Sequence, residues 1–132
     1  MVKSELDPAL PAHTILVVED DVLVRALVCD ALRDGGLQVV EAASADEAVR
    51  YLQTDSSIQC VFSDVKMPGS MDGLDLAKRL KLDFPHLKTV LTSGHLLPDD
   101  VEKGTLLIMK PYPIDEIAGR IMAILEDRER AG

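Results

Sequence analysis

Short apolar runs alternate with longer amphipathic segments along this chain of 132 residues. Five runs are rich in aliphatic side chains and show little polar alternation, which is typical of strands buried on both faces. They lie at residues 13–18, 37–42, 58–63, 88–92 and 106–109. Because the strands alternate with helices, the pattern predicts an α/β fold, a doubly wound five-stranded parallel sheet covered by helices on both faces.

Three of the intervening segments carry the signals of helices. Residues 22–34 end at a pair of glycines, a common helix stop. The sequence Ser44-Ala-Asp-Glu47 is a capping box, so a second helix is expected to begin there. A third is predicted at residues 74–83. The first helix has an expected inner stripe of Val24, Leu27, Val28, Ala31 and Leu32.

The last third of the chain leaves little room for a fourth helix of ordinary length. Seventeen positions separate Ser93 from Lys110, and a mean helix of about 11 residues with a mean strand of about 5 would fill them before any loop. This helix is therefore expected to be short or absent, a turn or two within residues 98–103. The final helix is predicted with an inner stripe of Ile114, Ile117, Ile121, Ile124 and Leu125.

Length and composition indicate one domain that binds neither nucleic acid nor membrane. We expect the domain at residues 13–127, with tails at 1–12 and 128–132. Lys and Arg total 14 against 23 Asp and Glu, and the net charge of −9 repels phosphate backbones and anionic lipids. No apolar signal segment opens the chain. Cys29 and Cys60 lie among apolar neighbours and are expected to be core thiols, which fits a cytoplasmic protein.

Chemically active side chains follow four of the five predicted strands. Glu19 and Asp20 come after the first strand, Asp64 after the third, Ser93 after the fourth and Lys110 after the fifth. The carboxyl ends of parallel strands meet at one edge of a sheet, so we expect these groups to gather there. Clustered carboxylates repel one another unless a hard cation neutralises them, and Mg²⁺ fits oxygen ligands. A magnesium site is therefore predicted.

Such a site suits phosphoryl transfer to a carboxylate. A carboxylate can attack phosphorus and form an acyl phosphate, with a metal bridging the reacting oxygens. Lys110 would add a positive charge and Ser93 a hydroxyl donor, although Thr92 competes with Ser93 for that role. The alternative for Glu19, Asp20 and Asp21 is an N-cap cluster favoured by the helix dipole.

The motifs at these positions resemble the response-regulator receiver family of two-component signalling from about residue 13 to residue 125. The matching segments are Leu-Val-Val-Glu19-Asp20-Asp21, Ser63-Asp64-Val-Lys-Met-Pro68, Met71-Asp-Gly73-Leu, Thr92-Ser93-Gly94 and Met109-Lys110-Pro111. The resemblance implies that Asp64 is the phosphoacceptor and that Asp20, Glu19 through water, and the Lys66 carbonyl hold Mg²⁺ with it. It also implies that Ser93 is the switch hydroxyl and that Lys110 binds the phosphoryl group, before a cis peptide bond.

By this resemblance the chain is a signalling domain in a phosphorelay and not an enzyme with a separate substrate. Its partners would be a histidine kinase or histidine phosphotransfer protein and an unknown output protein. Since nothing follows Gly132, output is expected by protein contact or as a phosphate sink. The alternative is a receiver segment excised from a hybrid sensor histidine kinase.

Two other proteins with this kind of sheet fit the sequence less well. A haloacid-dehalogenase-like phosphatase needs a second acid two residues after its nucleophile, where this chain has Lys66. A flavin-binding electron carrier would need aromatic side chains and a glycine-rich phosphate loop, but aromatic residues are 3% of the chain and no such loop follows the first strand.

Overall fold

A computed structural model of the protein describes residues 13–95 and 104–131, with side chains as far as residue 126. It contains one sheet of five parallel strands in the order β2-β1-β3-β4-β5. The chain moves from β1 to one edge of the sheet and then back past β1 to β3. The point where the order reverses therefore lies between β1 and β3, where the doubly wound fold leaves a crevice at the carboxyl ends of the strands.

The elements follow the predicted alternation closely. The strands are β1 Thr14–Val18, β2 Gln38–Ala42, β3 Cys60–Asp64, β4 Lys88–Ser93 and β5 Leu106–Met109. The helices are α2 Val22–Asp34, α3 Ala45–Thr54, α4 Gly73–Asp83 and α5 Ile117–Ala131, and a 3₁₀ turn, η1 Ile114–Glu116, precedes α5. The expected short helix at residues 98–103 lies outside the described residues. The predicted fold class is confirmed.

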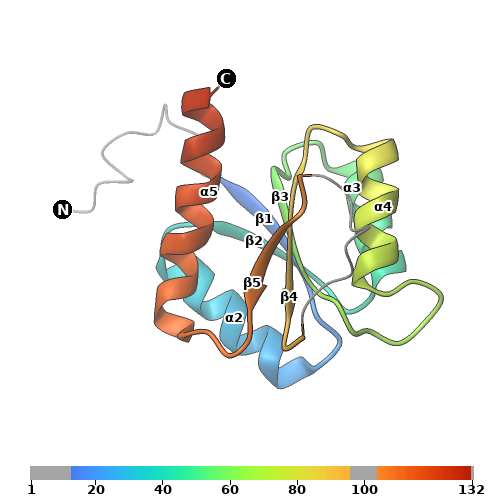
Figure 1. Ribbon diagram of the computed structural model, residues 1–132, viewed down its shortest axis with the longest axis horizontal. Helices are drawn as coiled ribbons and strands as arrows, with labels where there is room; N and C mark the ends of the chain where they lie inside the picture. The colour runs from blue at the N-terminus through green and yellow to red at the C-terminus, as the bar shows by residue number, and fades with distance from the viewer. Residues whose placement is uncertain (1–12, 96–103, 132) are drawn as a thin grey trace.

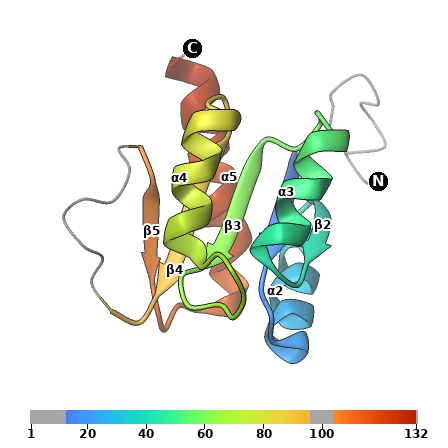
Figure 2. The same ribbon diagram turned by 90° about the vertical axis from the view of Figure 1, so that its right-hand side faces the viewer.

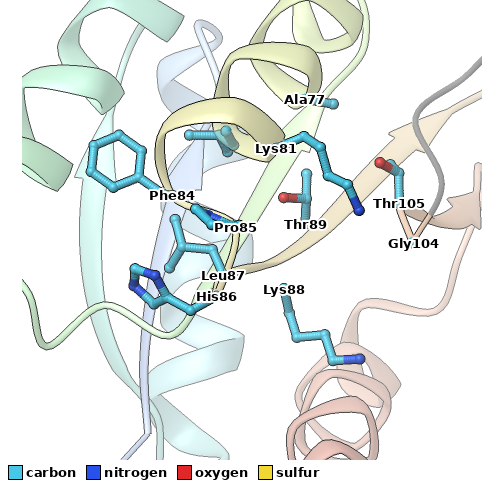
Figure 3. Close-up of a pocket in the computed structure, with 11 residues that line it drawn as sticks. Ala77, Lys81, Phe84, Pro85, His86, Leu87, Lys88, Thr89, Gly104 and Thr105 are labelled. Atoms are coloured by element: carbon cyan, nitrogen blue, oxygen red, sulfur yellow. The ribbon is translucent and has the colours of Figure 1, made fainter.

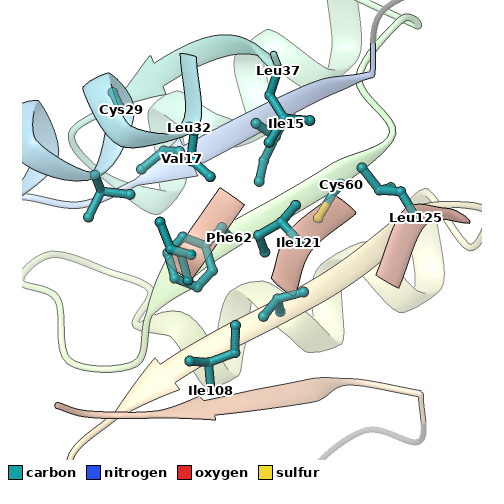
Figure 4. Close-up of a cluster of buried hydrophobic side chains, with 13 residues drawn as sticks. Ile15, Val17, Cys29, Leu32, Leu37, Cys60, Phe62, Ile108, Ile121 and Leu125 are labelled. Atoms are coloured by element: carbon teal, nitrogen blue, oxygen red, sulfur yellow. The ribbon is translucent and has the colours of Figure 1, made fainter. Parts of the chain in front are cut away.

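The two faces of the sheet carry separate hydrophobic clusters. Figures 1 and 2 show α2 and α5 on one face and α3 and α4 on the other. Under α2 and α5, the cluster includes Ile15, Phe62 and Ile121, and Cys29 and Cys60 are buried in it as thiols (Figure 4). The cluster under α3 and α4 is made by Leu16, Val18, Ala42, Ala45, Ala48, Val49, Leu52, Ile58, Val61, Leu76 and Leu80. Both faces of the strands are thus dry, as continuous apolar runs require.

The inner face of α2 differs from the predicted stripe. Val28, Cys29 and Leu32 are buried, whereas Val24 and Leu27 are exposed. The reason is that α2 approaches α5 through its C-terminal end, where an added Cβ at Gly35 would collide with the Cβ of Ala118. Burial begins at Val28, toward this end of the helix, and the residues of α2 before it are exposed or half-buried.

Two further details of the prediction are wrong. Ser93 is the last residue of β4 and not part of a loop, because it continues the β5 pairing opposite Met109. Ile114 does not belong to the inner stripe of the last helix. It lies in the 3₁₀ turn that begins after Pro113 and precedes α5, and it is exposed.

Candidate metal and phosphoryl site

Three carboxylates meet at the carboxyl edge of the sheet. Glu19 and Asp20 follow β1, and Asp64 is the last residue of β3. One oxygen from each carboxylate lies within 4.8 Å of the other two. Glu19 is buried, Asp64 is intermediate and Asp20 is exposed, so the group opens to solvent on the Asp20 side. The sequence-based expectation that these three acids gather is confirmed.

Lys110 brings a positive charge to the same edge. It directly follows β5, and its Nζ lies 3.2 Å from Oδ2 of Asp64. The backbone holds the two strand ends together, because the Lys110 N–H donates to the Ser93 carbonyl oxygen at 2.9 Å. The Lys110–Pro111 peptide bond is cis, as the resemblance implied. The exposed fraction is 13% for the Asp64 side chain and 37% for that of Lys110, so solvent reaches the pair mainly from the lysine side.

The acids at the end of β1 divide between capping and the carboxylate cluster. The Asp21 side chain accepts hydrogen bonds from the N–H groups of Leu23 and Val24 at 2.9 and 3.0 Å, which makes it the N-cap of α2. Glu19 accepts at Oε2 from the Asp21 N–H at 3.0 Å. The N-cap interpretation therefore holds for Asp21, while the carboxylates of Glu19 and Asp20 face Asp64.

Burial and like charge act on the titratable groups of the site. Burial raises the pKa of Glu19, the negative charge of Asp64 adds to this rise, and the hydrogen bond from the Asp21 N–H opposes it. Tyr112 packs edge-on against Phe62, with ring centroids 6.2 Å apart. Burial is the main cause that raises the pKa of Tyr112, and the negative charges of Glu19 and Asp64 raise it further. In both groups burial is the main cause of the raised pKa, and the nearby carboxylate charges act in the same direction.

Both candidate hydroxyls at the end of β4 are buried. Thr92 is paired in register with Asp64, and its Oγ1 has no hydrogen-bond partner among the described residues. Ser93 Oγ accepts from the His95 N–H at 3.0 Å, which leaves its own proton available for donation. Buried polar groups are normally satisfied, so the unpartnered Thr92 hydroxyl is an unusual feature of this edge.

Gly73 packs closely against the backbone of Asp64 and Val65. Its N–H donates to the Val65 carbonyl oxygen at 2.8 Å at the start of α4. A Cβ added here would collide with the Asp64 carbonyl oxygen and lie 2.7 Å from the Val65 Cα. Only glycine permits this approach, so the first residue of α4 holds the start of the loop that follows Asp64. Lys66 lies two residues beyond Asp64 in this loop and is exposed.

This arrangement of acids and lysine agrees with the comparison to known families. The sequence profile described as "Response regulator receiver domain" matches residues 15–121, which is most of the chain and contains every site residue above. The chain belongs to the response regulator receiver domain family. Members of this family are domains of two-component signalling, so the expected function class is confirmed at that level.

Individual relatives of this receiver domain differ in how much of them it spans. It is 34% identical over 124 residues to "Sensor kinase CckA" of Brucella abortus, covering 88% of the chain but 13% of the kinase. It is 28% identical over 116 residues to "Sporulation initiation phosphotransferase F" of Bacillus subtilis, covering 84% of the chain and 92% of that protein. The chain therefore spans a small part of one relative and nearly all of the other.

Solved structures give the same fold. The receiver domain of the hybrid histidine kinase CckA superposes with a TM-score of 0.69 at 33% identity, covering 83% of this chain and 95% of that one. A CheY-like receiver domain protein from Methanospirillum hungatei superposes with a TM-score of 0.82 over 92% of this chain and all of that one. At 24% identity the second match supports the fold alone.

The sequence prediction missed an apolar surface beside the site of this receiver domain. Val22, Leu23 and Leu27 on α2 are exposed, with 65%, 76% and 63% of each residue accessible. They follow the carboxylates of the β1 end by a few residues. The signal was present in the sequence, because six of the first seven helix positions are apolar, more than one buried face can use.

A cavity of about 210 Å³ lies away from these groups (Figure 3). It is formed by the end of α4, the turn that follows it and the residues at the amino ends of β4 and β5, at the opposite edge of the sheet from Asp64. Its lining includes Lys81, Phe84, His86, Thr89 and Thr105. The cavity therefore shares no residue with the carboxylate cluster.

Among the described residues, no helix is long and apolar enough to cross a membrane.

Proposed function

We propose that this receiver domain accepts a phosphoryl group on Asp64 from a histidine kinase or a histidine phosphotransfer protein. The observation that carries the proposal is the convergence of Glu19, Asp20 and Asp64 at one edge of the sheet, with Lys110 Nζ 3.2 Å from Asp64. Three acids and a lysine at the ends of three strands are the groups that phosphoryl transfer to a carboxylate requires. The proposed receiver domain occupies residues 13–127, with tails on either side.

The donor set fits a hard divalent cation, for which Mg²⁺ is the natural choice. All three side-chain ligands are carboxylates within 4.8 Å of one another, and the pKa of Glu19 is raised by burial and by the charge of Asp64. We assign Asp20 and Asp64 as direct ligands, Glu19 as a ligand through water and the Lys66 carbonyl as a further ligand. When bound, the ion neutralises the charge that builds on the transferring phosphoryl oxygens.

The chemical step uses groups of this chain that are already in place. An Asp64 carboxylate oxygen attacks the phosphorus of a phosphohistidine, and the new O–P bond forms as the P–N bond breaks. The imidazole nitrogen of the donor keeps the electron pair and takes up a proton. Lys110 exchanges its contact with Asp64 for the phosphoryl oxygens, and Ser93 donates its hydroxyl proton to another of them. Hydrolysis of the acyl phosphate returns the carboxylate and inorganic phosphate, which is the only turnover we assign to the protein.

The exposed face of α2 is where we expect the phosphoryl donor to dock. Val22, Leu23 and Leu27 form an apolar patch at the end of α2 that follows the acids of β1. Contiguous exposed apolar side chains mark interaction sites, and a donor histidine must come within bonding distance of Asp64. A patch that borders the nucleophile can bind the donor while its histidine reaches the carboxylate.

Because phosphoryl donors of this kind are charged from ATP, and because both cysteines are core thiols, we place the protein in the cytoplasm.

Two assignments of the whole protein are open to test. In the first, the domain acts alone, and its output is contact with another protein or storage of phosphate. In the second, it is a receiver segment of a hybrid sensor histidine kinase, which is favoured by the 34% identity to a kinase of which it covers 13%. The complete reading frame around this sequence decides between them, because the second requires kinase domains in the same frame.

Phosphotransfer from candidate histidine kinases with radiolabelled ATP tests the proposed function. Wild-type protein should take up label that withstands acid and is lost with hydroxylamine, whereas Asp64→Asn should take up none. Asp72→Asn is the matched control, because Asp72 is a carboxylate in the same region that caps α4 instead of joining the cluster. Label that persists in Asp64→Asn at the wild-type rate contradicts the proposal.

A second pair of variants tests the docking face. Leu23→Ser should slow labelling by the kinase and leave labelling by acetyl phosphate unchanged, since a small donor needs no docking surface. Leu82→Ser is the control, because Leu82 on α4 is also exposed, at 80%, but lies near the other end of the sheet. Equal rates for the two variants with the kinase would show that the α2 patch does not receive the donor.

A further inference from the structure

The side chain of Arg25 joins three elements next to the carboxylate cluster. It projects from α2, and its Nη1 donates to the main-chain oxygen of Glu19 at 2.7 Å. Its Nε donates to Oε1 of Glu41 on β2 at 3.3 Å. The side chain is only 18% exposed, although it carries a full charge. A guanidinium so deeply placed, with a hydrogen-bond acceptor on each side, has a defined orientation.

Glu41 is itself held by a second arginine. Arg33, two turns further along α2, donates from Nη2 to Oε2 of Glu41 at 3.0 Å and to the Val39 carbonyl oxygen at 3.3 Å. Each oxygen of the Glu41 carboxylate therefore has its own arginine. The two arginines differ in their second acceptor. Arg25 binds the carbonyl oxygen of Glu19, which belongs to the carboxylate cluster, whereas Arg33 binds the carbonyl oxygen of Val39.

The Glu19 carbonyl is the point from which two of the three acids are positioned. It belongs to the peptide that joins Glu19 to Asp20, and the N–H on the other side of Glu19 donates to the Ala42 carbonyl oxygen at 3.0 Å. With both ends of Glu19 bound, the backbone from which the Glu19 and Asp20 side chains project is held in place. Without such restraint, three mutually repelling carboxylates would move apart.

We propose that Arg25 is a positioning residue for divalent-cation binding, held in its working orientation by Glu41 of the edge strand. The inference rests on the proposed function, since it concerns the affinity of the same site. Arg25 contributes by direction and not by charge. Removing a positive charge near a cation site strengthens cation binding by Coulomb's law, so weaker binding in a variant without Arg25 has to come from lost geometry.

The test compares Arg25→Met with Arg33→Met. Each variant removes one positive charge that pairs with the Glu41 carboxylate. Magnesium affinity is measured by calorimetric titration of the folded proteins. Arg25→Met should bind about tenfold more weakly than wild type, the lower end of the effect of outer-shell partners on metal sites. Arg33→Met should bind as tightly as wild type or more tightly. Arg25→Lys should fall between, because one ammonium group cannot span both acceptors.

A variant that is merely less stable serves as a further control. Leu125→Ala removes a buried side chain of α5, remote from the site, and should lower stability while magnesium affinity stays at the wild-type value. Wild-type affinity in Arg25→Met, or equal weakening in Arg25→Met, Arg33→Met and Leu125→Ala, overturns the inference. A wild-type protein that binds no magnesium overturns the metal site itself, so the two failures are distinguishable.

Discussion

At the amino end of β1, the side-chain amides of Gln38 and Gln59 hydrogen-bond to Thr14, whereas at the carboxyl ends of the strands three carboxylates lie together with a lysine. At the amino end, Oε1 of Gln59 accepts from the Thr14 N–H at 3.1 Å and lies 3.2 Å from Nδ1 of His13. Oε1 of Gln38 lies 3.4 Å from the Thr14 hydroxyl. The polar groups of this end thus find partners within the chain.

The carboxyl end leaves its polar groups incompletely satisfied. One lysine contacts one of the three carboxylates, and the Thr92 hydroxyl has no partner among the described residues. Both ends belong to the same strands and lie over the same two hydrophobic clusters, but the doubly wound fold leaves its crevice at the carboxyl ends. The unsatisfied groups therefore lie at the end where a ligand can bind, as is typical of functional sites.

The largest effect is expected from Gly73→Ala. The added methyl group would collide with the backbone of Asp64 and Val65, and overpacking of this kind destabilises by up to about 3 kcal/mol. Denaturant unfolding measures the loss. Gly69→Ala is the control for a loop glycine with open space around it, although its positive φ of 105° adds strain of its own. Wild-type stability in Gly73→Ala would mean that the loop under Asp64 is not held by this contact.

Magnesium should stabilise the protein through the carboxyl end of the sheet and not through the amino end. A ligand that binds only the folded state stabilises it by about 2.7 kcal/mol at a hundredfold excess over Kd, so the melting temperature should rise. Asp20→Asn should show a smaller rise. Gln59→Ala should lower the starting stability, because it removes the hydrogen bonds at the amino end, yet it should keep the full rise with magnesium. Equal magnesium shifts in wild type and Asp20→Asn would contradict the assignment of the acids.

Thr92→Val should stabilise the protein. Valine keeps the shape of the side chain and removes a buried hydroxyl without a partner, which is worth about 1 kcal/mol. Thr89→Val is the matched control at the other end of β4, because the Thr89 residue lines the cavity shown in Figure 3, and no gain is expected there. A loss of stability in Thr92→Val would show that the hydroxyl makes a contact in solution.

The smallest effect concerns pH in the absence of metal. Burial raises the pKa of Glu19, so its ionised form is disfavoured in the folded state. The sign follows from linkage: the contribution of Glu19 to stability is fully present below the pKa of the unfolded chain and is lost as the pH rises through the folded pKa. Glu19→Gln should therefore flatten this part of the curve of unfolding free energy against pH. An unchanged slope would mean that Glu19 is not the group responsible.

Most of the fold could be predicted because the hydrophobic periodicity changes at the element boundaries. The bounds of α2 and β5 were predicted to the residue, and the capping box at Ser44 marked the start of α3 correctly. The inner face of α2 could not be predicted, since nearly all of its first positions are apolar and the Gly35 contact with α5 decides which are buried. That contact joins residues more than eighty positions apart.

The carboxylate cluster could be predicted from the ends of strands, but its supports could not. Glu19, Asp20, Asp64 and Lys110 each follow an apolar run, and a parallel sheet gathers such positions at one edge. Arg25 gave no such signal, because an arginine on a helix is usually solvated. Its contacts with the Glu19 carbonyl and with Glu41 depend on how α2 crosses the strands, which only the packed structure specifies.

The most direct test of the account is to locate the phosphoryl group chemically. The protein is incubated with acetyl phosphate and magnesium, and borohydride then reduces any acyl phosphate to an alcohol, which peptide mass spectrometry assigns to a residue. We predict that the reduced carboxyl is that of Asp64 and that chelation of magnesium prevents the reaction. Reduction at another carboxylate, or none in protein that is folded and binds magnesium, would contradict it.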